Sequence, residues 1–112
     1  MLIESNNTTL VIDAGPDFRQ QMLRENVRHL DAIVLTHEHK DHISGMDDVR
    51  AFNYKSQDAI DIYAEERVQA AVRKDYSYVF AEYQYPGIPR MRLNNIPDYG
   101  FTVNKLTLVP LR

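Results

Sequence analysis

The 112-residue sequence contains no cysteine, and none of its apolar runs approaches the length needed to cross a bilayer. The absence of cysteine excludes a disulfide framework and removes thiolate from any metal site. The first residues also lack a basic segment followed by a long apolar one, so we expect a cytoplasmic location and no membrane partner.

The charge balance is close to even, with 13 Lys and Arg against 16 Asp and Glu and a formal net charge of −3. Such a balance provides no broad positive field, and this argues against general nucleic-acid binding through phosphate contacts. The hydrophobic fraction of 44% and the charged fraction of 26% are ordinary for a globular protein. The length predicts a single domain over residues 1–112.

The first third of the sequence predicts a hairpin, a helix and a buried strand. Residues 1–5 and 8–13 favour strands, and the two asparagines between them tolerate the positive φ angles of a tight turn. A helix is expected from Pro16 or Asp17 to about Asn26. Residues 32–36 form a short apolar run of the kind that is buried on both faces of a sheet. The apolar face of the helix consists of Phe18, Met22 and Leu23.

Helical and strand periodicities continue to alternate after residue 45, which predicts a layered α/β fold (α+β layered). The elements expected there are a helix over 46–53, a strand over 60–64, a helix over 65–80, a loop over 81–100 with a strand near 91–96, and one or two strands over 101–111.

Three of the four histidines lie within six residues, directly after the apolar strand, in the segment Thr36-His37-Glu38-His39-Lys40-Asp41-His42. Imidazole nitrogen and carboxylate oxygen are ligands of zinc and similar ions. A tight loop would let His37, His39, Asp41 and His42 converge on one small volume, with room for two neighbouring ions. The alternative is a solvated polar loop, which this density of donors disfavours. The fourth histidine, His29, is expected to be an ordinary surface or core residue.

This segment, with the apolar strand before it and Gly45 after it, resembles the His-x-His-x-Asp-His signature of the metallo-β-lactamase superfamily. The upstream run Val11-Ile12-Asp13-Ala14-Gly15 is similar to the first motif of that superfamily. Within the superfamily, residues 13–19 and 45–50 look most like the cyclic phosphodiesterase branch of phosphonate breakdown, which acts on 5-phosphoribosyl 1,2-cyclic phosphate.

The resemblance implies two divalent metal ions, with zinc expected first and manganese or iron as alternatives. His37 and His39 would bind one ion. Asp41 and His42 would bind the other, and a water or hydroxide between the ions would attack the substrate. Asp41 would accept the proton of that water. Asp13 would orient a ligand histidine without binding metal itself, although a simple strand-end turn carboxylate is the alternative.

The implied function is a metal-dependent hydrolase, a phosphodiesterase that uses a metal-bound hydroxide on a small cyclic phosphate or nucleotide-like ester. Within the enzyme class, the same motif occurs in tRNA 3′ processing nucleases and thioesterases, which are the alternatives.

The sequence departs from the family pattern because no histidine follows His42. Superfamily members add a later histidine, a bridging aspartate and a final histidine, on a four-layer αββα sandwich made of two similar halves. We therefore expect the N-terminal half of such a sandwich, with an incomplete ligand set, one sheet face without its partner, and association with a second copy through that face. A non-catalytic metal-binding or assembly half-domain is the alternative function.

Four tyrosines lie close together beside the proline-rich loop. Aromatic residues in a loop can hold a substrate or a partner, but tyrosines near a helix end more often pack on the core with their hydroxyls in water. We expect packing for this group, which consists of Tyr76, Tyr78, Tyr83 and Tyr85.

Overall fold

The computed structural model describes residues 1–5, 7–81, 87–104 and 106–110, with Lys40 and Lys55 described by their backbone only. Within these residues the main sheet has five strands in the order β1-β2-β3-β4-β5. The β1 and β2 strands form an antiparallel hairpin, and the other neighbouring pairs are parallel. The five strands are β1 (Leu2–Ser5), β2 (Thr8–Ile12), β3 (Ala32–Val34), β4 (Ile60–Tyr63) and β5 (Met91–Asn94).

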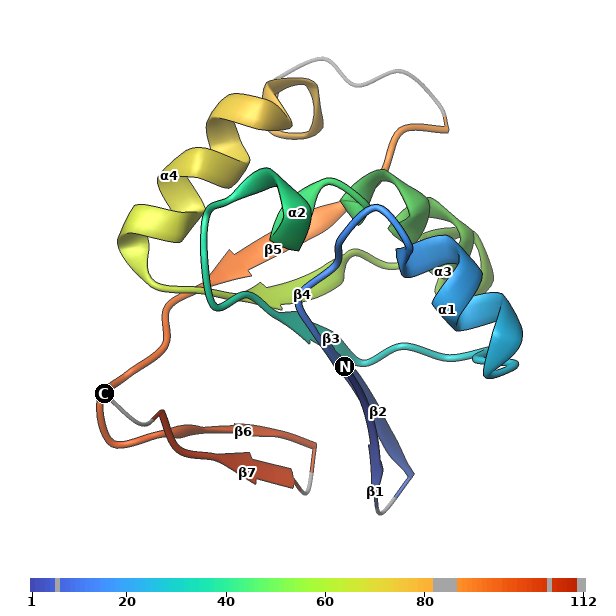
Figure 1. The fold of residues 1–112 in the computed structure, drawn as a ribbon, viewed down its shortest axis with the longest axis horizontal. Helices are drawn as coiled ribbons and strands as arrows, with labels where there is room; N and C mark the ends of the chain where they lie inside the picture. Colours follow the sequence, from blue (N-terminus) through green and yellow to red (C-terminus); the bar gives the residue numbers. More distant parts are fainter. Residues whose placement is uncertain (6, 82–86, 105, 111–112) are drawn as a thin grey trace.

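Helices cover one face of the main sheet, and a separate antiparallel hairpin lies on the other side (Figure 1). The hairpin consists of β6 (Phe101–Val103) and β7 (Leu106–Leu108). Among the residues described, no helix combines the length and the apolar character needed to cross a membrane. The helical elements are α1 (Phe18–Arg24), α2 (Lys40–Ile43), the 3₁₀ turn η1 (Met46–Val49), α3 (Arg50–Ser56), α4 (Glu66–Asp75) and the 3₁₀ turn η2 (Ser77–Val79).

The core is divided between the two faces of the sheet. Val11 and Ile33 pack among the helices, while Leu10 and Ala32, their neighbours in the same strands, pack against the β6–β7 hairpin. All three residues of β3 are buried, as predicted for a strand enclosed on both faces. The larger side chains among them, Ile33 and Val34, each contribute about 1.5 to 3 kcal/mol through their removal from water.

The predicted elements occur in the predicted order, and most differences lie at their boundaries. The helix expected over 65–80 ends at Asp75, because Tyr76 leaves the helical conformation with φ −119° and ψ 38° and its side chain is buried. The helix expected over 46–53 divides into η1 and α3. Leu23 is 69% exposed, so the apolar face of α1 reduces to Phe18 and Met22.

The structure corrects the expectation that one sheet face lacks a partner. Leu10 and Ala32 have no exposed surface on that face, and the Tyr63 ring stacks on the Phe101 ring with 4.4 Å between centroids. The chain therefore covers the second face of the sheet with its own hairpin. Association with a second copy stays a prediction, but this covered face is no longer an argument for it.

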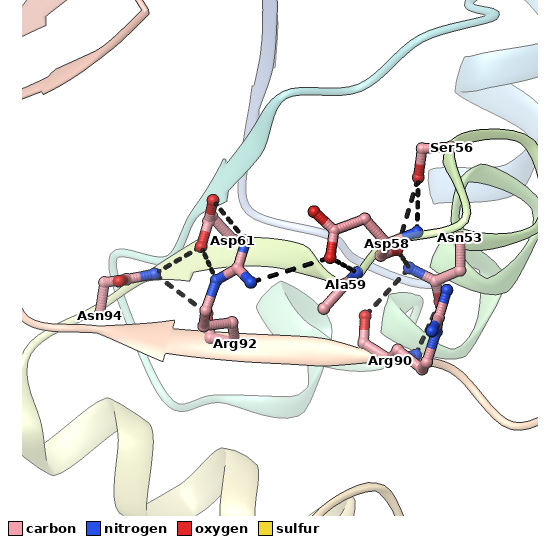
Figure 2. A network of polar contacts seen from close by, with 8 residues as sticks. All are labelled: Asn53, Ser56, Asp58, Ala59, Asp61, Arg90, Arg92 and Asn94. Carbon is pink, nitrogen blue, oxygen red and sulfur yellow. Dashed lines mark hydrogen bonds and ion pairs between the residues drawn. The ribbon is translucent and has the colours of Figure 1, made fainter.

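A buried asparagine connects α3 to the segments that lead directly into β4 and β5 (Figure 2). Asn53 Nδ2 donates to the carbonyl oxygens of Asp58 and Arg90 at 3.0 Å each, and its Oδ1 accepts the Arg90 amide at 2.7 Å. Farther along the same strands, Arg92 Nε donates to Asp61 Oδ1 at 2.7 Å. One side chain thus pairs three backbone groups at the edge of the sheet opposite to the carboxyl ends of its parallel strands.

Replacing this asparagine should destabilise the protein strongly. Asn53→Ala would remove three hydrogen bonds at a buried site and leave the Arg90 amide without the acceptor that Asn53 supplies, so we expect a loss of about 2 to 4 kcal/mol in the free energy of unfolding. Urea denaturation followed by circular dichroism measures this loss. Gln20→Ala, at an exposed position of α1, is the control and should change stability by less than about 0.5 kcal/mol. Equal stabilities of the two variants would contradict the role given to Asn53.

Candidate metal centre

The candidate site lies where two neighbouring parallel strands end. β2 ends at Ile12 and β3 at Val34, so the segments that follow them start at the same edge of the sheet. The Asp13 amide donates to the Val34 carbonyl at 2.8 Å. Asp13 has a φ of 62°, a left-handed conformation that aspartate tolerates better than most residues. This turn brings the first motif against residues 36–45, which we call the metal loop.

Backbone contacts hold the metal loop against the turn after β2. The Ala14 amide donates to the His42 carbonyl at 2.7 Å, and the Gly45 amide donates to the Ala14 carbonyl at 2.8 Å. The two segments approach so closely that a Cβ on Gly15 would lie 2.3 Å from the Asp41 carbonyl oxygen. The two glycines are therefore required by space at this crossing.

The Asp13 carboxylate is the centre of the hydrogen-bond network. Its Oδ1 accepts the Thr36 amide at 2.9 Å, and its Oδ2 accepts both the Thr36 hydroxyl at 2.7 Å and His42 Nδ1 at 2.8 Å. Since the Thr36 hydroxyl donates its proton to Asp13, its oxygen accepts from His37 Nδ1 at 3.0 Å. This network assigns Nδ1 as the protonated nitrogen of His37 and His42, and leaves Nε2 of each ring as the nitrogen for a metal.

The electrostatics of the network favour a positive charge at His42. Burial alone would raise the pKa of Asp13, but the hydrogen bonds from the Thr36 amide, the Thr36 hydroxyl and His42 outweigh it and lower that pKa. The hydrogen bond to Asp13 raises the pKa of His42 despite partial burial, and the charges of Asp13 and Asp41 act in the same direction. A proton or a divalent cation can supply the positive charge that this environment stabilises.

Three of the four predicted ligands offer donor atoms at one point. The candidate atoms of His39, Asp41 and His42 all lie within 4.8 Å of one another. His37 is not part of that group, but its ring centroid lies 5.0 Å from the His42 ring and 5.8 Å from the His39 ring. Two imidazoles and a carboxylate fit the preferences of zinc and similar divalent ions. The ligand assignments and the second ion stay predictions.

The sequence assigned no role to two features of this site. Thr36 stands beside His37 in the motif, where its hydroxyl could have been considered as a link to Asp13. The contacts that Arg67 of α4 and Tyr76 directly after it make with the metal loop join residues that are 29 and 33 positions apart, and no local pattern indicates them. His29 Nε2 donates to Asp31 Oδ1 at 2.7 Å, as an ordinary surface histidine would. Tyr83 and Tyr85 lie outside the described residues.

Comparison with known proteins gives one family and several structural relatives. Residues 8–112 match the family described as the beta-lactamase superfamily domain. A solved structure of a diphosphatase from the PhnP family has 29% sequence identity and a TM-score of 0.81, and the match covers 97% of this chain and 41% of that one. The predicted fold class is confirmed by this agreement.

Two further structures show the fold alone. The metallo-β-lactamase fold protein YhfI from Bacillus subtilis has 20% identity and a TM-score of 0.64, with 96% of this chain and 43% of that chain covered. The MIM-2 metallo-β-lactamase has 21% identity and a TM-score of 0.62, with 95% and 42% covered.

A curated relative is an octanoyltransferase from Porphyromonas gingivalis, 42% identical over 113 residues. That alignment covers 100% of this chain and 23% of the relative. The chain therefore spans less than half the length of each of these proteins.

The close crossing of the two loops leads to a prediction about Gly15. Gly15→Ala should push the Asp41 carbonyl away and cost about 1 to 3 kcal/mol of stability, because the added Cβ overlaps backbone and not a flexible side chain. Urea denaturation measures the cost. Ser44→Ala, at an exposed position of the same loop, should leave stability unchanged. A Gly15→Ala variant as stable as the parent would show that the loops can separate without cost.

Proposed function

Because the chain belongs to the beta-lactamase superfamily, we propose that it is the metal-holding part of a metal-dependent hydrolase. The observation that carries the proposal is the Asp13 carboxylate, which fixes His42 beside His39 and Asp41. The chain spans 41% of the diphosphatase that it matches, so the proposal concerns the activity of the complete enzyme.

The proposed substrate is a small phosphodiester, such as a cyclic phosphate or a nucleotide-like ester. The match to a PhnP-family diphosphatase over 97% of this chain supports an enzyme that acts on phosphate-oxygen bonds. The similarity of residues 13–19 and 45–50 to the cyclic phosphodiesterase branch favours a diester over other phosphate compounds. The octanoyltransferase match covers 23% of that protein, so it gives no support for acyl transfer by these residues.

The residues of the metal loop have distinct proposed roles. His37, His39, Asp41 and His42 would hold the ions, with zinc as the first candidate. Divalent ions bound there would make water a nucleophile near neutral pH and polarise the phosphoryl oxygen. Asp41 is 77% exposed, so its carboxylate can reach an attacking water and accept the proton. Asp13 and Thr36 would keep the imidazole rings oriented throughout.

A non-catalytic metal-binding segment is the second candidate, because the donor atoms of His39, Asp41 and His42 could hold an ion without a reaction following. A complete polypeptide that binds metal but does not hydrolyse phosphodiesters would favour this second candidate. The cytoplasmic location and the absence of general nucleic-acid binding stay predictions.

The ligand role of Asp41 leads to a prediction about activity. Asp41→Asn in the complete polypeptide should lower hydrolysis of bis(p-nitrophenyl) phosphate by at least about 100-fold, because the amide is a poor ligand and accepts no proton. Release of p-nitrophenol measures the rate, and metal analysis measures the bound ion. Asp75→Asn, at an exposed position of α4, is the matched control. Parental activity in Asp41→Asn would exclude this mechanism.

The central position of Asp13 leads to a prediction about metal affinity. Asp13→Asn has one acceptor oxygen in place of two and cannot accept all three hydrogen bonds from the Thr36 amide, the Thr36 hydroxyl and His42, so we expect zinc affinity to fall by about 10- to 100-fold. Competition with a chromophoric chelator measures this fall, and circular dichroism checks that the fold is kept. Unchanged zinc affinity in a folded Asp13→Asn variant would assign Asp13 to turn formation alone.

A further inference from the structure

We propose that α4 and the turn after it position the metal loop, and that the buried hydroxyl of Tyr76 is the group that does so. The inference rests on the proposed function, because it concerns residues that hold the metal ligands in place. Figure 1 shows α4 beside α2, the short helix that contains Asp41 and His42. Tyr76 follows α4 directly.

The contact is a single buried hydrogen bond between distant parts of the chain. Tyr76 Oη donates to the Ile43 carbonyl at 2.6 Å, across 33 positions of sequence. Tyr76 is 6% exposed and Ile43 is 1% exposed, so water does not compete for this bond. Ile43 is the last residue of α2 and the neighbour of His42.

Two successive carbonyls of the metal loop are held by two different elements. The His42 carbonyl accepts the Ala14 amide at 2.7 Å, and the next carbonyl, that of Ile43, accepts the Tyr76 hydroxyl. Fixing both carbonyls fixes the peptide group between them, and with it the direction in which the His42 side chain leaves the backbone. A helix of four residues cannot maintain this orientation alone, because its last carbonyls have no partners within the helix.

Two exposed contacts accompany the buried one. Arg67 Nε lies 3.1 Å from Glu38 Oε2, near the start of the metal loop, and the Tyr78 hydroxyl donates to Asp47 just after its end. An exposed ion pair contributes little free energy in water. Three polar contacts among the described side chains therefore join residues 67–78 to residues 38–47, and that of the Tyr76 hydroxyl is the one shielded from solvent.

The Tyr76 hydroxyl is protonated at neutral pH. Burial, supported by the nearby charge of Asp47, raises the pKa of Tyr76 to about 12. The donor is therefore present around neutral pH.

The experiment separates the hydroxyl from the ring. Tyr76→Phe keeps the ring in the core and removes only the donor. Tyr54→Phe removes a hydroxyl from a side chain that is 81% exposed, and it serves as the matched control. Hydrogen exchange is measured on the metal-free protein at the amides of Ala14 and Gly45, which bond across the two loops. Zinc affinity is measured by chelator competition, and the absorption spectrum of the cobalt-loaded protein reports ligand geometry.

We expect exchange at the Ala14 and Gly45 amides to become about fivefold faster in Tyr76→Phe, as the loss of one hydrogen bond predicts. Zinc affinity should fall by about tenfold, and the cobalt bands should shift. Tyr54→Phe should match the parent in all three measurements.

Unchanged exchange at both amides, with zinc affinity within about twofold of the parent, would overturn the proposal. An equal acceleration across β3 would overturn it too, because it would show a general loss of stability. If the parent bound no zinc, the proposed function would fail, while a local change in exchange would still support positioning of the loop by Tyr76.

Discussion

The geometry of the candidate site depends on the carboxylate of Asp13. This group connects the ends of two neighbouring strands. Asp13 lies directly after β2, and its carboxylate accepts hydrogen bonds from both the amide and the hydroxyl of Thr36, which lies after β3. The same carboxylate accepts a hydrogen bond from His42, in the helix that follows. The imidazole is thus oriented by the protein itself, and an arriving ion would meet donors that are already in place.

The metal loop and the turn after β2 stabilise each other because backbone groups of one form hydrogen bonds with backbone groups of the other. Neither segment is part of a strand, and unpaired buried amides and carbonyls in them would be costly. Cross-loop bonds from Ala14 and Gly45 remove this cost, and the absence of a Cβ on Gly15 allows the approach. Side-chain chemistry and backbone packing at this site therefore depend on the same crossing.

Local sequence patterns predicted the helices and strands, and ligand chemistry predicted a group of metal-binding side chains. Neither could predict which distant residues would form hydrogen bonds with each other. The apolar run before the histidines and the asparagine turn have clear local causes, so the strands and the first hairpin were expected. The ring of Tyr76 packs as expected of a tyrosine at a helix end, yet its hydroxyl bonds to a backbone carbonyl. Every residue has such a carbonyl, so no sequence pattern marks this acceptor. The position of β6 and β7 over the sheet likewise follows from tertiary packing, which the alternation of apolar and polar residues along a strand does not specify.

The covered face of the sheet also affects the surroundings of the metal loop. A cavity of about 270 Å³ lies between the main sheet and the hairpin, and its lining includes Thr36 together with Phe101 and Leu108. Thr36 thus contributes its amide and hydroxyl to Asp13 while bordering an apolar space on the hairpin side. The β6–β7 hairpin therefore both buries the second face of the sheet and forms one wall of the cavity that Thr36 lines. The hairpin that completes the core thus also borders Thr36, the residue whose amide and hydroxyl hold the Asp13 carboxylate.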